Sequence, residues 1–142
     1  MEPTLLGLIL DSSVIIEAER KHQTVEDLLT AIRQRFGEVE IAMSAVTVAE
    51  LVHGVERANT SEVRQRRRAF IDELKKHVPV QPVTEETGEL AGTISGRQAM
   101  KGTTLPIDDL LIAASAMEQD YALATLNRRH FDKIPSLNVV AF

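Results

Sequence analysis

The sequence contains no cysteine and no tryptophan among its 142 residues. Without cysteine, the protein can form no disulfide framework, thiolate nucleophile, cysteine-ligated zinc site or iron–sulfur cluster. Its four histidines form no HxxxH or similar pair, which argues against an all-protein zinc site. Any metal would therefore be bound by oxygen or imidazole ligands, and the hard cations Mg²⁺ and Mn²⁺ remain possible.

Basic residues are also in deficit, since 16 Lys and Arg stand against 21 Asp and Glu, for a formal net charge of −5. This balance argues against non-specific binding to duplex nucleic acid, which depends on basic side chains that neutralise phosphates, although local basic patches can still bind. The apolar run at 5–10 is too short to span a membrane, and no basic residues precede it as they would in a signal peptide. We expect one domain over 1–142, no membrane association and, by default, a cytoplasmic location.

Short apolar runs alternate with amphipathic stretches along the chain. Ser12 or Ser13 is expected to cap the first helix, and Ser44 the third. The alternation is typical of an α/β protein, and we predict a three-layer sandwich in which helices cover both faces of a mostly parallel central sheet. The pattern predicts strands at 5–10, 39–43, 79–83, 121–125 and 137–142, and helices at 14–21, 24–36, 44–57, 60–74, 84–100 and 107–118.

Polar residues follow several of these strands, where an open parallel sheet places its functional site. Asp11 ends the first strand, and Glu50 lies two turns into the helix after the second strand. Asp108 and Asp109 open the mostly apolar helix at 107–118, and Thr125 and Asn127 follow the fourth strand. The topology therefore allows carboxylates that are distant in sequence to converge on one point.

Each of these residues also has a purely structural interpretation. Asp11 and Asn127 are common turn residues, and Thr47 with Glu50 matches a helix capping box. Acids in the first turn of the helix at 107–118 would complement its dipole. Clustering favours function, because neighbouring carboxylates repel one another unless a divalent cation compensates their charge. Such a cluster suits cleavage of phosphoryl or phosphodiester bonds, in which Mg²⁺ or Mn²⁺ activates a water and neutralises phosphate charge.

Four segments closely resemble, in order, the signature segments of PIN-domain ribonucleases, and VapC-type toxins match best. They read DSSVII from Asp11, SAVTVAEL from Ser44, DLLIAA from Asp109 and TLNRRHF from Thr125. The resemblance covers nearly the whole chain. It implies a PIN-like fold and endonucleolytic cleavage of RNA with bound Mg²⁺ or Mn²⁺, with water as the nucleophile and products that carry 5′-phosphate and 3′-hydroxyl ends.

The resemblance also implies roles for individual residues. Asp11, Glu50 and Asp109 occupy the three acidic positions and would be the metal ligands. Asn127 occupies the fourth catalytic position, where it would offer a neutral oxygen or orient a water. Asp108 lies one residue before the third acidic position, so we treat it as an accessory acid and keep the alternative that the register is shifted by one.

Two further residues depart from the family pattern or support it. His130 stands where the final motif often has an acid, which suggests a site with three acids. Ser13 matches a small hydroxyl-bearing position that either caps the helix or holds a metal-bound water.

Several basic residues could bind an RNA backbone, although a run of charge is more often a solvated helix face. They are Arg64, Arg66, Arg67, Arg68, Lys75, Lys76, Arg128 and Arg129.

Partners also follow from the resemblance. VapC-like toxins are paired with an antitoxin protein whose C-terminal segment lies across the acidic groove, and the toxin chains commonly form homodimers. A catalytically silent PIN-like binding module and a housekeeping RNA-processing nuclease remain alternatives. A haloacid-dehalogenase-like phosphatase needs a second acid where this chain has Ser13, and a response-regulator receiver needs an acidic pair where it has Asp11 alone.

Overall fold

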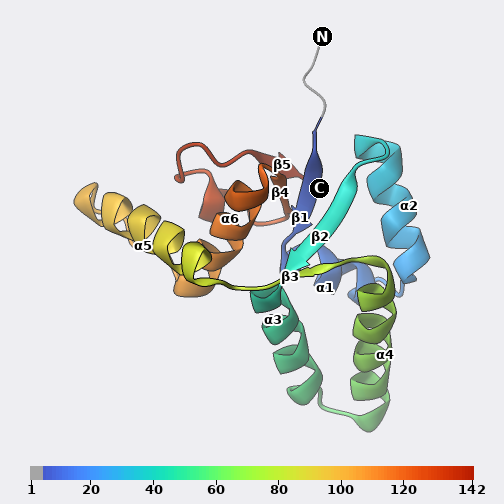
Figure 1. The fold of residues 1–142 in the computed structure, drawn as a ribbon. Helices are drawn as coiled ribbons and strands as arrows, with labels where there is room; N and C mark the ends of the chain where they lie inside the picture. The colour runs from blue at the N-terminus through green and yellow to red at the C-terminus, as the bar shows by residue number, and fades with distance from the viewer. Residues whose placement is uncertain (1–4) are drawn as a thin grey trace.

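The computed structural model describes residues 5–142, in which a five-stranded sheet lies between two layers of helices (Figure 1). All neighbouring strands are parallel, in the order β3-β2-β1-β4-β5. Their bounds are β1 Gly7–Leu10, β2 Glu40–Ser44, β3 Val80–Gln81, β4 Ala122–Thr125 and β5 Val139–Ala141.

Seven helices connect and flank these strands within residues 5–142. Helices α1 to α4 pack with one face of the sheet, and helices α5 to α7 pack with the other. This arrangement confirms the predicted three-layer α/β sandwich. The helices are α1 Ser12–Arg20, α2 Val25–Phe36, α3 Ala45–Glu56, α4 Ser61–His77, α5 Glu85–Met100, α6 Ile107–Gln119 and α7 Arg128–Phe131.

The central strand β1 is buried on both faces because its side chains alternate between two cores. Leu8 and Leu10 belong to the core beneath α1 to α4, whereas Ile9 belongs to the core beneath α5 and α6. All three residues are 0% exposed. The uninterrupted apolar run that predicted this strand therefore reflects burial from both sides, as expected for a parallel sheet.

Several predicted boundaries were wrong in detail. The first strand begins at Gly7, the third spans only Val80–Gln81, and the short helix α7 was not predicted. Neither Ser12 nor Ser13 caps α1, because both lie inside the helix and Asp11 is its N-cap residue. This difference matters, because it releases the Ser13 hydroxyl to bind elsewhere.

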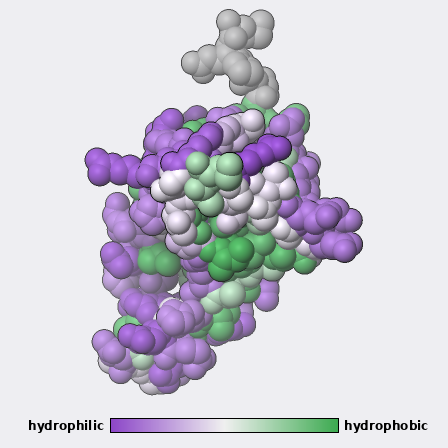
Figure 2. All heavy atoms as spheres, turned by 90° about the vertical axis from the view of Figure 1, so that its left-hand side faces the viewer, coloured by the Kyte–Doolittle hydropathy of each residue, from purple (hydrophilic) through white to green (hydrophobic). Residues whose placement is uncertain are grey.

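The outer surface of the α5 side is mostly hydrophilic, with a smaller hydrophobic area near the centre of the face shown (Figure 2). Among the described residues, no helix combines the length and apolar character that a membrane span requires. Helix α5 packs chiefly on α6 and projects away from the sheet (Figure 1).

Candidate active site

Asp11 is fixed at the junction of β1, α1 and β4. It follows β1 directly, and its amide donates a hydrogen bond of 3.0 Å to the main-chain oxygen of Ala124. Its Oδ2 atom accepts hydrogen bonds from the hydroxyls of Ser13 (2.7 Å) and Thr125 (2.8 Å). Both hydroxyls bind the same oxygen of a side chain that is almost fully buried, so the orientation of the carboxylate is set before any ligand arrives.

The two hydroxyls are themselves held by the main chain that follows β4. The amide of Leu126 donates to Ser13 Oγ (3.0 Å), and the amide of Asn127 donates to Thr125 Oγ1 (2.9 Å). Each hydroxyl therefore accepts from the β4 end and donates to Asp11. The network links residues more than 100 positions apart and explains why a serine two residues after Asp11 belongs to the site.

Glu50 projects from the interior of α3. The helix begins after Ser44, whose hydroxyl accepts a hydrogen bond of 3.1 Å from the amide of Val46. The alternative in which Thr47 and Glu50 form a capping box is therefore wrong. Oε1 of Glu50 is buried and has no hydrogen-bond partner among the described residues, and the same is true of Oγ1 of Thr47.

Burial raises the pKa of Glu50 to about 7, and the nearby Asp108 carboxyl contributes to the rise. The Ser12 hydroxyl lowers this pKa, and the charge of Asp11 adds a smaller increase. A glutamic acid with this pKa is partly protonated at neutral pH when no cation is bound. The site therefore carries more negative charge than its own surroundings stabilise.

Asp109 lies at the start of α6, with its side chain 13% exposed. Burial, followed by the charge of Asp108, raises its pKa, and Asp11 adds to the rise. His130 opposes the shift, since its Nδ1 atom lies 3.3 Å from Asp109 Oδ2. His130 therefore lies beside Asp109, the third acidic position, and the final motif contributes no carboxylate at position 130.

Four acids lie at this edge of the sheet: Asp11, Glu50, Asp108 and Asp109. Burial and the charges of neighbouring acids raise the pKa values of Glu50 and Asp109, but the four side chains do not enclose a common point. Within residues 5–142, no three Asp, Glu or His side chains are close enough to hold a metal ion as they stand. The donor chemistry nevertheless fits a hard divalent cation, because the ligand atoms are carboxylate oxygens and Glu50 Oε1 is buried without a partner. The assignment of Asp11, Glu50 and Asp109 as ligands stays a prediction.

Asn127 is placed beside this network through its backbone, not through its side chain. Its amide binds Thr125, while its exposed side chain does not cap α7. The sequence places Thr125 after the fourth predicted strand together with Asn127, but its direct contact with Asp11 was not predicted. The available signal was a hydroxyl residue at the end of the strand that pairs with β1, where Leu10 lies opposite Ala124.

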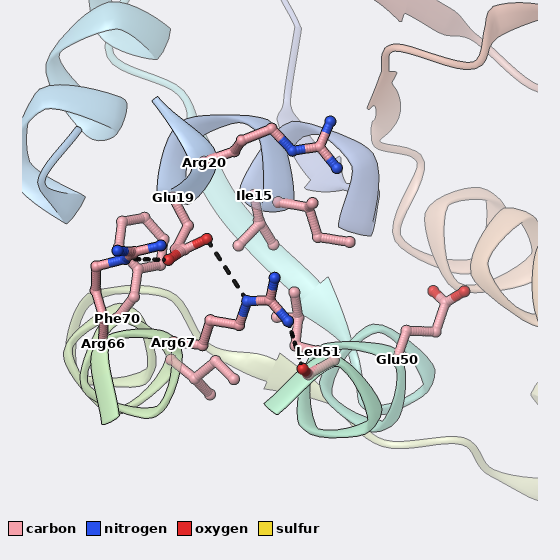
Figure 3. Close-up of a pocket in the computed structure, with 11 residues that line it drawn as sticks. Ile15, Glu19, Arg20, Glu50, Leu51, Arg66, Arg67 and Phe70 are labelled. Carbon is pink, nitrogen blue, oxygen red and sulfur yellow. Dashed lines mark hydrogen bonds and ion pairs between the residues drawn. The ribbon is translucent and has the colours of Figure 1, made fainter. Parts of the chain in front are cut away.

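The basic run of α4 is used mainly within the protein. Arg64 donates to the oxygen of Ala58, Arg68 pairs with Asp72, and Lys76 pairs with Glu73. These contacts favour a structural role for the run over a dedicated RNA grip. Two of its members, Arg66 and Arg67, face Glu19 across a groove between α1, α3 and α4 (Figure 3).

Comparison with known proteins identifies the family. The PIN domain family matches residues 8–137. The ribonuclease VapC1 of Rickettsia felis is 31% identical over 135 residues, which cover 95% of this chain and 96% of that protein. The ribonuclease VapC10 of Mycobacterium tuberculosis is 33% identical over 130 residues, which cover 92% of this chain and 90% of that protein. The chain belongs to the VapC ribonucleases of the PIN-domain family.

A solved structure agrees in fold. The crystal structure of VapBC2 from Rickettsia felis, bound to a DNA fragment from its promoter, contains a chain that matches with a TM-score of 0.82. Sequence identity to that chain is 21%, and the match covers 95% of the present VapC-type chain and 98% of the other. The match extends over nearly the whole of both chains, so the sheet and both helical layers are shared.

Proposed function

We propose that this VapC-type ribonuclease is the toxin of a toxin–antitoxin pair and hydrolyses RNA phosphodiester bonds in a reaction that depends on Mg²⁺ or Mn²⁺. The observation that carries the proposal is the buried, unpartnered Oε1 of Glu50 among acids that raise its pKa. A buried carboxylate in such surroundings needs a positive partner, and a divalent cation provides it without protonation.

Each residue has a defined task in this proposal. Asp11, Glu50 and Asp109 would hold the cation, and Ser13 and Thr125 keep the Asp11 carboxylate oriented. When bound, the cation would lower the pKa of a water nucleophile and neutralise charge on the phosphate. Asn127 follows β4 with an exposed amide side chain that is available to orient a water or the RNA.

The partner that we propose is an antitoxin of the kind present in the VapBC complex. The groove between α1, α3 and α4 has a volume of about 270 Å³ and contains Glu50 among its lining residues (Figure 3). Ile15, Ile16 and Phe70 give it an apolar surface. A partner segment that fills this groove would pass beside the acidic site, where a basic residue would be attracted. A homodimer and a cytoplasmic location stay predictions.

Cleavage assays with the purified chain test the catalytic proposal. We expect generic RNA to be cut with Mg²⁺ or Mn²⁺ present, not to be cut with EDTA, and not to be cut by an Asp11→Ala variant. Glu62→Gln is a matched control, because Glu62 is an exposed acid in the first turn of α4. Activity that survives both EDTA and Asp11→Ala would contradict a metal-dependent mechanism.

The two remaining alternatives have separate tests. A silent binding module would bind RNA or the antitoxin without cutting RNA under any metal condition. A housekeeping nuclease would lack a neighbouring gene for a short protein with a DNA-binding N-terminus and a flexible C-terminus, whereas a toxin should have one.

A further inference from the structure

Arg67 of α4 connects the two helices that carry Asp11 and Glu50. Its Nη1 atom donates a hydrogen bond of 2.7 Å to the main-chain oxygen of Gly54 in α3. Its Nε atom lies 4.0 Å from Oε2 of Glu19 in α1. Figure 3 shows the guanidinium between these two partners, with both interactions drawn as dashed lines. One side chain of α4 therefore contacts both α1 and α3.

The oxygen of Gly54 is available because it lies in the last turn of α3, where main-chain oxygens lack helical partners. The amide of Ala58, four residues further on, donates to Val55 instead (3.2 Å). Arg67 thus satisfies a terminal carbonyl and places a positive charge at the C-terminal end of the helix, which the helix dipole favours.

Glu19 holds the other side of this connection. Its side chain is 11% exposed, and Oε1 accepts a hydrogen bond of 2.8 Å from Arg66 Nε while Oε2 faces Arg67. A carboxylate with so little exposure is stable only when it is paired. Loss of one arginine would leave Glu19 less well compensated, so the end of α1 is fixed to α4.

Helices α1 and α3 also carry charges of the same sign, at the N-terminal end of α1 and near the middle of α3. Asp11 is the N-cap residue of α1, and Glu50 lies one turn before Gly54 in α3. Repulsion between these carboxylates would fall if α3 moved away from α1. The hydrogen bond of Arg67 to Gly54 and its longer ion pair with Glu19 oppose that movement.

We propose that Arg67 is a positioning residue that holds α1 and α3 together against this repulsion and keeps Glu50 within reach of the cation bound by Asp11. The inference rests on the proposed metal-dependent function. Arg67 touches neither the cation nor the RNA in this role and acts only through the helices that it joins.

The inference is tested by measuring Mn²⁺ binding to the metal-free full chain with titration calorimetry. Arg67→Met should weaken Mn²⁺ affinity by at most about tenfold, the lower end of the loss for partners that contact a metal ligand directly, because Arg67 acts only through the helices that it joins. Arg67→Lys should recover part of the affinity, because one ammonium cannot reach both partners as a guanidinium does. Arg68→Met is the matched control, since Arg68 pairs with the exposed Asp72 of its own helix, and it should leave affinity unchanged.

A second readout separates positioning from simple stabilisation. Hydrogen exchange at the amides of 51–55 should be faster in Arg67→Met than in wild type, whereas a merely structural role would lower Tm without changing the Mn²⁺ affinity of folded molecules. Folded Arg67→Met with wild-type affinity would overturn the inference. If Arg67→Met does not fold, Glu19→Gln replaces it, because this variant weakens the same ion pair and its Mn²⁺ affinity is measured in the same way. A wild-type chain that binds no Mn²⁺ would overturn the proposed function itself, and this inference with it.

Discussion

The hydroxyl of Thr125 donates a hydrogen bond of 2.8 Å to Oδ2 of Asp11, although 114 positions separate the two residues. Thr125 ends β4 and Asp11 follows β1, so the bond exists because these two parallel strands are neighbours. The same hydroxyl accepts the amide of Asn127. The Thr125 hydroxyl therefore links the orientation of Asp11, a predicted metal ligand, to the backbone of Asn127, the predicted fourth catalytic residue.

Thr125→Val keeps the shape of the side chain and removes both hydrogen bonds. We expect Mn²⁺ affinity and RNA cleavage to fall by about tenfold to a hundredfold, because partners that orient a metal ligand commonly contribute that much. Titration calorimetry and cleavage rates measure the two losses. Thr93→Val is the control, since Thr93 is exposed on α5 and bonds only to Glu89 of its own helix. Unchanged affinity in Thr125→Val would show that Asp11 does not need this bond.

The sequence predicted the central part of the fold well, for a physical reason. The apolar run before Asp11 reflects a strand buried on both faces, and the predicted helix cap at Ser44 is confirmed because it depends on local sequence. The extent of β3 was overestimated, because its pairing with β2 involves only two residue pairs and pairing is a tertiary property.

The candidate site was predictable only in part. Asp11, Glu50 and Asp109 could be proposed from their place after strands and from family motifs. The use of Ser13 could not, because its sequence position suited a helix cap equally well, whereas its hydroxyl donates to Asp11 and accepts from the distant amide of Leu126. The basic run of α4 was also ambiguous, since only the packing of α1 against α4 pairs Glu19 with its arginines.

Gly7 lies against the ring of Tyr121, so a side chain at this position would clash with the ring. A Cβ atom at Gly7 would lie 2.6–2.7 Å from three ring carbons of Tyr121, whose hydroxyl is hydrogen-bonded to Glu40. We expect Gly7→Ala to destabilise the fold by about 1–3 kcal/mol, the usual cost of overpacking. Gly88→Ala is the control, because a Cβ there meets no atom and alanine favours the helix by about 1 kcal/mol. Urea unfolding of both variants measures the contrast, and equal stabilities would contradict it.

The raised pKa of Glu50 predicts how the stability of the metal-free protein depends on pH. The folded state favours the protonated form, so this contribution is fully present below pH 4.5 and is lost as pH rises through about 7. Glu50→Gln, which stays neutral, should therefore gain stability relative to wild type as pH rises over this range. Thermal unfolding of both proteins without metal at pH 5 and pH 7.5 measures the change. A difference in Tm that does not depend on pH would contradict the assignment.

Asp109 and Asp108 are adjacent but have different neighbours, and this predicts different consequences when each is neutralised. Asp109 lies beside His130, whereas Asp108 acts on Glu50 and raises its pKa. If Asp109 is the third ligand, Asp109→Asn removes a bond to the cation and should cost about tenfold or more in cleavage rate. Asp108→Asn removes a repulsive charge beside Glu50, so it should cost less and should lower the pH at which Mn²⁺ binds. Cleavage rates and Mn²⁺ titrations over pH 5.5–8 compare the two variants, with His130→Gln as a control for the contact of Asp109. A larger loss in Asp108→Asn would move the third ligand by one residue and would place Asp108, the acid nearer to Glu50, at the cation.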